Sequence, residues 1–457
     1  MGRGVLQIRR FEIRQNLIAT LLVLSAIMLG GGGSPAPIPE MLLQMVALLL
    51  LIGWAFAGGT PIPRASRPAW VLAGLAIVLP LVQLIPLPPF LWTSLPGRET
   101  ERAALALIGA DTTWRPWSVA PARTLASLLA LLVPALALLF TASLGRAGRS
   151  MLVAAVAGGG LLSLFAGAAQ MAGGELSPFR FYESAADYLH GFQANHNSTA
   201  DVLLIAMVAF AASVREWGER RRMLGQTNIC LMLVAGSTLL FSLGVFLTGS
   251  RAGVLLLPIA WIAIAMIVRP WVPRDRRSAA LASAAALVLI AVAAVYLHSN
   301  NVLIRIADRF SFEGEFRPQL WRDARYAVAQ YFPWGAGVGT FVPVFIAIER
   351  LEVVDPTVPN RAHNELLELL MEGGAVGAVL LAAAMYLITR RLWQSLRDPP
   401  AGSIGQAWFS AATITLITLH SQIDYPLRSI SLASIAAVAV GLLMPVNVQP
   451  RDEVRLS

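Results

Sequence analysis

Arginines in two short segments of this sequence have the chemistry to bind a phosphate or diphosphate group. TGSRAG contains Arg251 between two apolar runs, and EFRPQLWRDAR contains Arg317, Arg322 and Arg325. A guanidinium group holds phosphate oxygens through paired hydrogen bonds and stays charged at every physiological pH. The alternatives are an interfacial anchoring role for Arg251 and a solvated helix face for Arg325, with Asp323 as its counter-charge. As a set, these arginines favour an anion site.

A histidine stands beside a row of glutamates where another apolar run begins. His363 opens HNELLELLMEGG, in which Glu365, Glu368 and Glu372 recur at helical spacing. A helix N-terminus and nearby arginines both disfavour the imidazolium, so we expect a neutral His363 that can accept a proton as a general base. Alone, such a histidine would also suit a structural role. The acidic row is costly in a membrane without cationic partners; the candidates are Arg361, Arg251 and the EFRPQLWRDAR arginines.

Two further polar segments end apolar runs on the same predicted side. GFQANHNS carries Asn197, and LHSQIDYPLR carries His420, Asp424 and Arg428. We expect Asn197, His420 and Asp424, with Arg361, to support the histidine and the arginines. No DxD, HExxH, P-loop or GxSxG motif is present, so we expect no metal and no other cofactor.

The composition indicates a protein that is embedded in a lipid bilayer. Of its 457 residues, 56% are hydrophobic and 13% are charged, and the mean hydropathy is +0.66. One soluble core could not bury so much apolar surface. A net charge of +9 would suggest nucleic acid in a soluble protein, but here the basic residues separate hydrophobic runs, so we expect no nucleic-acid partner. The single cysteine, Cys230, excludes a disulfide framework.

The apolar runs have the length that a helix needs to cross a bilayer. None alternates as a β-barrel strand does, so we predict an all-α polytopic membrane protein with about 12 transmembrane helices. The expected spans lie near residues 17–31, 41–57, 69–89, 123–144, 151–172, 198–214, 228–247, 252–268, 279–297, 364–389, 403–420 and 428–445.

The distribution of arginine predicts the orientation. If the N-terminus is cytoplasmic, more than half of the basic residues fall on the inner side, and the short outer loops hold few. Short loops are the ones that the positive-inside rule counts. We therefore expect both termini in the cytoplasm, and His363 with the candidate anion site on the opposite face.

Two outer loops are long. Residues 91–122 carry Trp92 and Trp114 among prolines, which predicts an interfacial segment on the membrane surface. Residues 298–363, between the ninth and tenth spans, exceed the usual length of a connection. Within them, apolar side chains recur at helical spacing over 318–331. We expect this loop to form a partly helical cap over the bundle.

Over roughly residues 190–430 the sequence resembles the bacterial O-antigen ligase and O-antigen polymerase superfamily of membrane glycosyltransferases. The SRAG element, the loop with RPQLWRDAR followed by PWGAGVGTF, and the HNELLELLMEGG helix start occur in that family's order. The combination is specific, whereas each piece alone is not. The resemblance implies a twelve-helix bundle that moves a glycan from an undecaprenyl-diphosphate carrier to an acceptor. Transfer would occur at the periplasmic face, with inversion and without a metal.

Site roles follow from position in these motifs. The resemblance assigns Arg251, Arg317 and Arg322 to the carrier diphosphate and His363 to the catalytic base. Which loop arginine contacts the diphosphate stays open because the loop varies, and Glu365 could share or replace the role of His363. Arginines already in place stabilise a departing diphosphate more than the bound ground state, because its negative charge increases as it leaves.

The expected organisation has three parts. Residues 1–190 hold the first five spans with the outer loop 91–122. Residues 191–430 form the ligase- or polymerase-like catalytic region with the periplasmic loop 298–363. Residues 431–457 hold the last helix and a cytoplasmic tail. The resemblance places this multi-pass chain in the bacterial inner (cytoplasmic) membrane, with a periplasmic active site.

The acceptor is not decided by the sequence. A lipid A core would make the protein a ligase, a second carrier-linked glycan a polymerase, and a protein hydroxyl an oligosaccharyltransferase; GAGVGTF slightly favours the polymerase and exopolysaccharide branch. The alternative class is a polysaccharide or lipid-linked oligosaccharide transporter or flippase. Transporters usually place polar residues near the middle of the membrane, on a path from both sides. Here the polar residues gather at one face, which favours an enzyme.

Overall fold

The chain folds into a bundle of long helices. The computed structural model describes residues 2–32, 37–58, 64–182, 188–220, 227–272, 317–350, 352, 358–400 and 403–445. Two short antiparallel strands, β1 (Pro86–Leu87) and β2 (Arg115–Pro116), pair with each other. The helices are α1 (Gly2–Leu29), α2 (Pro37–Gly58), α3 (Arg67–Gln83), α4 (Pro89–Trp92), α5 (Glu99–Ala106), α6 (Pro121–Ser143), α7 (Arg146–Gly173), η1 (Gly174–Leu176), α8 (His196–Arg220), α9 (Thr227–Leu247), α10 (Arg251–Val268), η2 (Arg269–Trp271), α13 (Arg317–Tyr331), α14 (Phe341–Ile348), α15 (Glu365–Arg397), α16 (Ile404–His420), η4 (Pro426–Arg428) and α17 (Ile430–Leu442).

Every predicted span except one overlaps a helix of the described chain. The exception, 279–297, lies outside the described residues. Among the residues that are described, eight helices are long and apolar enough to cross a membrane: α1, α2, α6, α7, α8, α9, α10 and α15. α3 and α17 are also apolar but shorter, with 17 and 13 residues. The protein is therefore an all-α membrane protein, and the figure of twelve spans stays a prediction.

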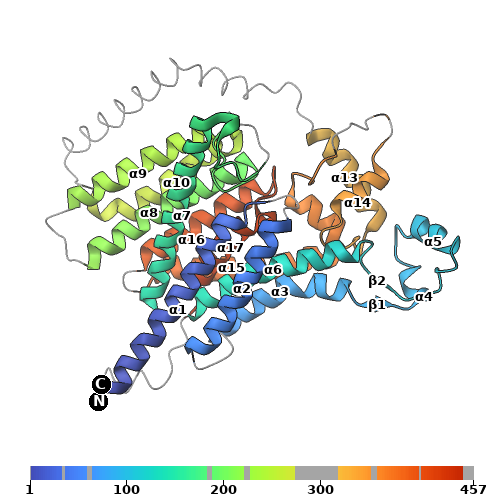
Figure 1. Cartoon of the computed structure of the whole chain (residues 1–457), viewed down its shortest axis with the longest axis horizontal. Coiled ribbons are helices and arrows are strands. Elements are labelled where there is room, and N and C mark those ends of the chain that lie inside the picture. Colours follow the sequence, from blue (N-terminus) through green and yellow to red (C-terminus); the bar gives the residue numbers. More distant parts are fainter. Residues whose placement is uncertain are drawn as a thin grey trace.

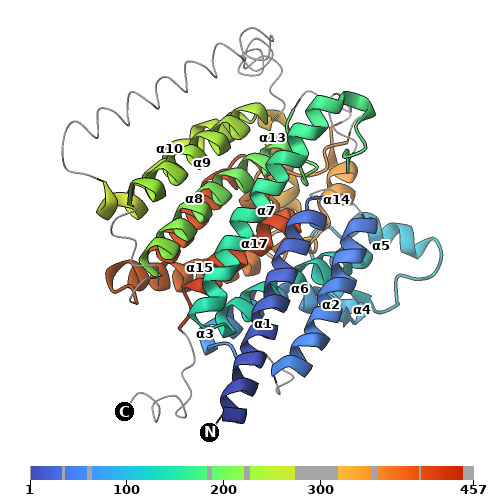
Figure 2. The ribbon, with the colours of Figure 1, turned by 60° about the vertical axis from the view of Figure 1, so that its left-hand side comes forward.

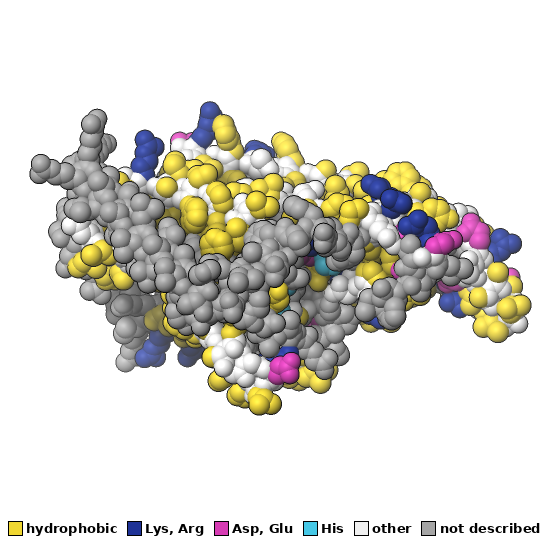
Figure 3. Space-filling model, turned by 90° about the horizontal axis from the view of Figure 1, so that it is seen from above, with side chains coloured by type: hydrophobic (Ala, Val, Ile, Leu, Met, Phe, Trp, Pro, Cys, Tyr) yellow, Lys and Arg dark blue, Asp and Glu magenta, His cyan; other side chains and the backbone are white. Residues whose placement is uncertain are grey.

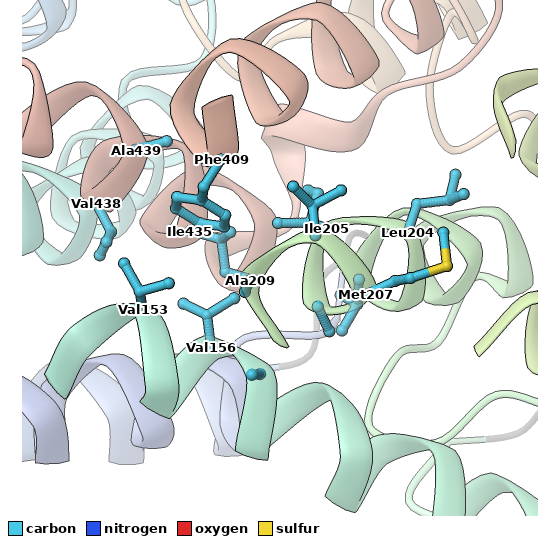
Figure 4. Close-up of a cluster of buried hydrophobic side chains, with 14 of the residues drawn as sticks. Val153, Val156, Leu204, Ile205, Met207, Ala209, Phe409, Ile435, Val438 and Ala439 are labelled. Carbon is cyan, nitrogen blue, oxygen red and sulfur yellow. The ribbon is translucent and has the colours of Figure 1, made fainter. Parts of the chain in front are cut away.

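Helix α8 lies at the centre of the bundle. Its apolar window is 83% buried, so it contacts other helices on nearly every side rather than lipid. α7, α9, α10 and α16 pack against it. Figure 4 shows the core between these helices and α17, where Val153, Ile205, Phe409 and Ile435 are drawn. Any polar side chain on α8 is therefore inside the protein and needs a partner there.

The two ends of the bundle differ in chemistry. At one end, Arg149 of α7 donates to the carbonyl oxygen of Leu442 at the end of α17, and Arg215 of α8 donates to that of Ile267 near the end of α10. Arg149 lies between the fourth and fifth expected spans and Arg215 between the sixth and seventh, in connections that the expected orientation places in the cytoplasm. The helices α8, α10, α15 and α17 begin at the opposite end, which we call the site end.

An arm and a cap extend from the bundle at the site end. Residues 86–116 form the arm, with β1, α4, α5 and β2, and residues 317–350 form the cap, with α13 and α14. Both lie on the right in Figure 1, whereas in Figure 2 α4, α5 and α14 are on the right and α13 lies nearer the middle. A Cβ atom on Gly97 of the arm would lie 2.6 Å from the ring of Tyr331, so arm and cap are in contact. The helix predicted over 318–331 is α13. The interfacial position expected for the arm stays a prediction.

Helix α15 is interrupted where its sequence reads MEGG. Gly374 has a φ of +56° and breaks the helix, so carbonyl groups just before it lack their helical donors. The loop segment PWGAGVG replaces these donors: the backbone N–H groups of Ala336 and Gly337 donate to the carbonyl oxygens of Met371 and Glu372, each at 2.9 Å. A broken helix in a membrane needs such protein partners. The loop thereby holds the first turns of α15, which carry the glutamates.

We expect the substitution Gly374→Ala to destabilise the protein and to reduce its activity. A Cβ atom there would lie 2.1 Å from the carbonyl oxygen of Pro333. With a ψ of −147°, this backbone conformation is one that essentially only glycine adopts, and it costs another residue about 1–3 kcal/mol. The midpoint of thermal aggregation in detergent measures the effect. Gly158→Ala in α7, where a Cβ would meet nothing within 4 Å, is the matched control, and an equal midpoint for the two variants would contradict the prediction.

Candidate active site

The start of α15 is fixed against the turn that follows α16. The backbone N–H of Glu365 donates to the carbonyl oxygen of Ser421 at 2.9 Å, and Asn364 Nδ2 donates to that of Gln422 at 2.9 Å. Asn364 also caps the helix, because its side-chain oxygen accepts the N–H of Leu367. The motif HNEL therefore has a local purpose. It starts the helix and ties that start to residues almost 60 positions later.

These ties bring His363 next to a carboxylate. His363 Nδ1 lies 3.1 Å from Asp424 Oδ1, and the ring of Tyr425 packs edge-on against the imidazole, with the centroids 4.9 Å apart. Asn197, at the start of α8, donates to the other oxygen of Asp424. A carboxylate at Nδ1 keeps the proton of a neutral imidazole on that nitrogen and leaves the lone pair on Nε2. Nε2 of His363 can therefore accept a proton.

Asp424 is held as an anion. Burial by itself would raise the pKa of Asp424, but the hydrogen bond and charge of His363, the charge of His420 and the hydrogen bond from Asn197 outweigh it and lower this pKa to about 2. A depressed carboxyl pKa contributes stability that is present above the unfolded value of 3.8 and is lost as the pH falls toward 2. At neutral pH, Asp424 therefore carries the charge that stabilises an imidazolium at His363.

The backbone of His363 is in an uncommon conformation. Its φ is +48°, the one positive φ at a non-glycine position among the described residues. Histidine enters this region more readily than β-branched residues, but it still costs energy that surrounding contacts must offset. Here the contacts come from the neighbours of His363, because Ala362 N donates to Glu368 Oε2 at 3.0 Å and Ala362 O accepts from Trp321 Nε1 at 3.0 Å. Such strain is typical of functional positions.

The side chains of His363 and Asp424 differ in exposure. The side chain of His363 is 15% exposed and that of Asp424 is 3% exposed. Figure 3 shows the face seen from above, where acidic and basic side chains gather toward one end and hydrophobic ones cover much of the rest of the described surface. The imidazole can thus be reached from outside while its carboxylate partner is shielded.

The acidic row of α15 forms a clamp around Arg428. The nitrogen atoms of Arg428 lie 3.4 Å from Glu365, 3.4 Å from Glu368 and 2.9 Å from Glu372. Arg361, one of the predicted partners, pairs with Glu368 at 3.0 Å. Burial opposes the charged form, but the three glutamates outweigh it and raise the pKa of Arg428. The main partner of the row therefore comes from the LHSQIDYPLR turn rather than from Arg251 or the cap.

Each glutamate of the row also holds a different backbone segment. Glu365 accepts the N–H of Leu427 at 2.7 Å and Glu372 accepts that of Phe341 at 3.3 Å, while Glu368 holds the residue before His363. The row thus joins η4, the start of α14 and the His363 loop to one helix. Both carboxylate oxygens of Glu365 are engaged in these contacts, which favours positioning over the shared base role expected from the sequence.

The candidate diphosphate-binding arginines lie in different surroundings. Arg251 is the first residue of α10, and Gly253, in the same turn, packs against α8 one turn below its start, so Arg251 belongs to the site end. Arg317, at the start of α13, is close enough to His420 to interact with it electrostatically. Arg322 is exposed on the cap. The structure therefore brings Arg251 and Arg317 to the site end and leaves Arg322 at the cap surface.

One part of the alternative interpretation of Arg325 differs in the structure. Asp323, the counter-charge that this alternative named, pairs with Arg350 at 2.7 Å. Arg325 is exposed. Because Arg350 follows α14, this ion pair joins the two ends of the cap, and sequence proximity alone could not reveal it.

A second buried pair lies below the first. His420 Nδ1 is 2.7 Å from both carboxylate oxygens of Asp201 on α8, and their side chains are 1% and 0% exposed. The sequence singled out His420 but not Asp201. One signal could have found it, since a lone carboxylate in an apolar span needs a partner.

The fold and the site define a membrane protein of the all-α class whose polar site lies at one end of a helix bundle. Residues 236–382 match the family model described as O-Antigen ligase, which confirms the resemblance seen in the motifs. The match supports an O-antigen ligase or polymerase type of membrane glycosyltransferase. It spans Arg251, the cap and His363 but ends before Asp424 and Arg428. No curated protein matches the chain.

Proposed function

We propose that this protein transfers a glycan from a polyprenyl-diphosphate carrier to an acceptor hydroxyl. The observation that carries the proposal is the pair of His363 and Asp424, at the same end of the bundle as Arg251 and Arg317. Asp424 orients the imidazole of His363 and compensates the positive charge that it gains as a base, and the arginines would bind the diphosphate. Undecaprenyl diphosphate is the carrier implied by the motif resemblance.

The proposed step is one displacement. Nε2 of His363 takes the proton from the acceptor hydroxyl as its oxygen forms a bond to the anomeric carbon. The bond between that carbon and the diphosphate oxygen breaks on the opposite face, and its electron pair leaves with the diphosphate. Asp424 stabilises the imidazolium that forms. A single displacement inverts the anomeric configuration and needs no metal.

The arginines act on the leaving group. Arg251 and Arg317 would hold the diphosphate oxygens while their negative charge increases, so they stabilise the transition state more than the bound donor. Arg322, exposed on the cap, would contact the diphosphate only if carrier binding moves the cap inward. We therefore assign the diphosphate first to Arg251 and Arg317.

The sidedness of the reaction is part of the proposal. Arg149 and Arg215 mark the end that the positive-inside rule assigns to the cytoplasm. The site end then faces the periplasm of a bacterial inner membrane, with both termini in the cytoplasm. A carrier-linked glycan in the outer leaflet would present its diphosphate at the level of Arg251.

The competing class is a transporter or flippase for a lipid-linked glycan. Such a protein needs polar groups along a path that opens to both sides. In the described residues, the charged groups named above lie at one end of the bundle or the other, and the core of α7, α8, α16 and α17 between them is apolar (Figure 4). This layout favours transfer at one face.

The test supplies a defined, fluorescent undecaprenyl-diphosphate oligosaccharide to the purified protein in vesicles. We expect donor to be consumed and free undecaprenyl diphosphate to appear. Products that lengthen without an added acceptor identify a polymerase; products that need lipid A core or a hydroxyl-bearing protein identify a ligase or a protein transferase. Donor that crosses the bilayer unchanged, with no acceptor used, would identify a flippase and overturn the proposal.

A further inference from the structure

The mechanism above does not use the buried pair of Asp201 and His420. Asp201 lies inside the central helix α8, and His420 is the last residue of α16. Their side chains are almost completely buried, and Nδ1 of the imidazole is 2.7 Å from both carboxylate oxygens. A charged carboxylate in such a place is costly unless a cation and hydrogen bonds match it. Its burial therefore indicates a permanent partnership with His420.

The second pair is in line with the first. His420 Nε2 lies 4.0 Å from Asp424 Oδ2, while Asp424 Oδ1 faces His363 at 3.1 Å. The contacts therefore run in the order His363, Asp424, His420, Asp201, from the partly exposed base to the buried first turns of α8 at the site end. Asp424 has an imidazole on each side.

The charges of this row depend on one another. Nδ1 of His420 contacts Asp201, while Nε2 lies 4.0 Å from Asp424 and makes no hydrogen bond within the described part of the chain. Two neighbouring carboxylates stabilise a positive charge on this imidazole, and the charge of Arg317 on the cap opposes it. A charged His420 with a charged Asp201 makes a neutral unit that still places a positive charge beside Asp424. That positive charge reduces the electrostatic stabilisation that Asp424 gives to a protonated His363. With His420 uncharged, Asp424 would bind a proton on His363 more firmly.

We propose that Asp201 and His420 are positioning residues: Asp201 holds His420 beside Asp424, and the charge of His420 moderates how strongly the Asp424 carboxylate stabilises a proton on His363. This inference rests on the proposed role of His363. It assigns a role to two residues outside the stretch that matches the O-antigen ligase family model. Among the described residues, the polar groups that face the row include Asn197 from α8, Tyr425 from the turn after α16 and Arg317 from α13. Asn360 and Arg361, from the loop before α15, lie next to Tyr425.

The first measurement is the pH dependence of kcat/KM for glycan transfer. In Asp201→Asn, the amide keeps a hydrogen bond to His420 but removes the charge that keeps His420 protonated. We expect the acidic limb of the profile to move to higher pH, by less than the roughly one to three units that a charge within about 4–6 Å produces, because His420 acts on His363 across Asp424. The double variant Asp201→Asn/His420→Gln, which leaves no buried charge in the pair, should show the same shift.

The second measurement does not depend on turnover. Diethyl pyrocarbonate modifies neutral imidazole, and mass spectrometry of the peptide that contains His363 gives its modified fraction at each pH. The midpoint for His363 should rise in both variants, together with the acidic limb. Because this readout needs no donor, it tests the coupling even if the proposed glycan transfer fails.

The matched control changes a carboxylate at the other end of the same helix. Glu216 is 4% exposed and is held by Gln406 and Arg220, so Glu216→Gln is the same kind of substitution far from the row. It should leave both midpoints unchanged. The inference is overturned if the His363 midpoint stays fixed in the folded Asp201 variants. It is also overturned if both Asp201 variants fail to accumulate while Glu216→Gln accumulates, since the pair would then be structural.

Discussion

Replacing His363 with Asn should lower glycan transfer by about 10²–10⁴-fold, the contribution typical of a general base. Asparagine tolerates a positive φ, so it suits the φ of +48° at this position while it removes the proton acceptor. The protein should still accumulate in the membrane. The rate of donor consumption in vesicles, per mole of folded protein, measures the loss.

A second substitution separates the side chain from the backbone. His363→Ala removes the imidazole but suits the left-handed conformation less well, so it should match the Asn variant in activity and be the less stable of the two. Transfer at the wild-type rate in His363→Asn would exclude the proposed base. Asp424 cannot account for a loss of activity near neutral pH in the native protein, because its pKa of about 2 keeps it ionised there.

Replacing Arg428 with Met should cause the largest loss of stability, about 3–5 kcal/mol, as expected when one member of a buried ion network is removed. The side chains of Glu368 and Glu372 are 0% exposed, and without Arg428 the described contacts leave only Arg361 to compensate Glu368. The clamp would then lose its hold on η4 and on the loop before His363. The midpoint of thermal aggregation in detergent measures the effect.

Two further variants test whether the loss of stability in Arg428→Met comes from the buried glutamates. Arg428→Met/Glu372→Gln should recover part of the stability, because the second change removes a buried negative charge that has lost its partner. Arg115→Met should have an effect below about 1 kcal/mol, since Arg115 and Glu101 are about one-third and one-quarter exposed and 3.8 Å apart. If Arg428→Met were as mild as Arg115→Met, the glutamate row would not depend on Arg428.

The acidic row illustrates what spacing can and cannot predict. The i, i+3, i+7 pattern correctly placed Glu365, Glu368 and Glu372 on one face of a helix, because that periodicity is local. It also implied cationic partners, and Arg361, only seven residues before Glu368, was among those expected. Arg428 was not, because it lies more than fifty residues along the chain and reaches the row only when α16 returns to the site end.

The sequence by itself determined the class of the protein and most of its helices. Runs of about 20 apolar residues must cross a bilayer as helices because unpaired backbone groups are too costly in lipid, and that rule needs no tertiary information. The ordered motifs around Arg251 and His363 also sufficed for the O-antigen ligase resemblance, which the family match at residues 236–382 confirmed.

Only the tertiary structure decided which arginines and carboxylates stand together. In the structure, Asp424 contacts His363 and Asp201 contacts His420. Arg317 lies near His420, and Arg322 is exposed on the cap. The physical reason is that burial forces charged groups to find partners, while the choice of partner depends on which helix ends meet. The packing of α8, α10, α13 and α16 at the site end therefore decides which of Arg251, Arg317 and Arg322 lie at the same end of the bundle as His363.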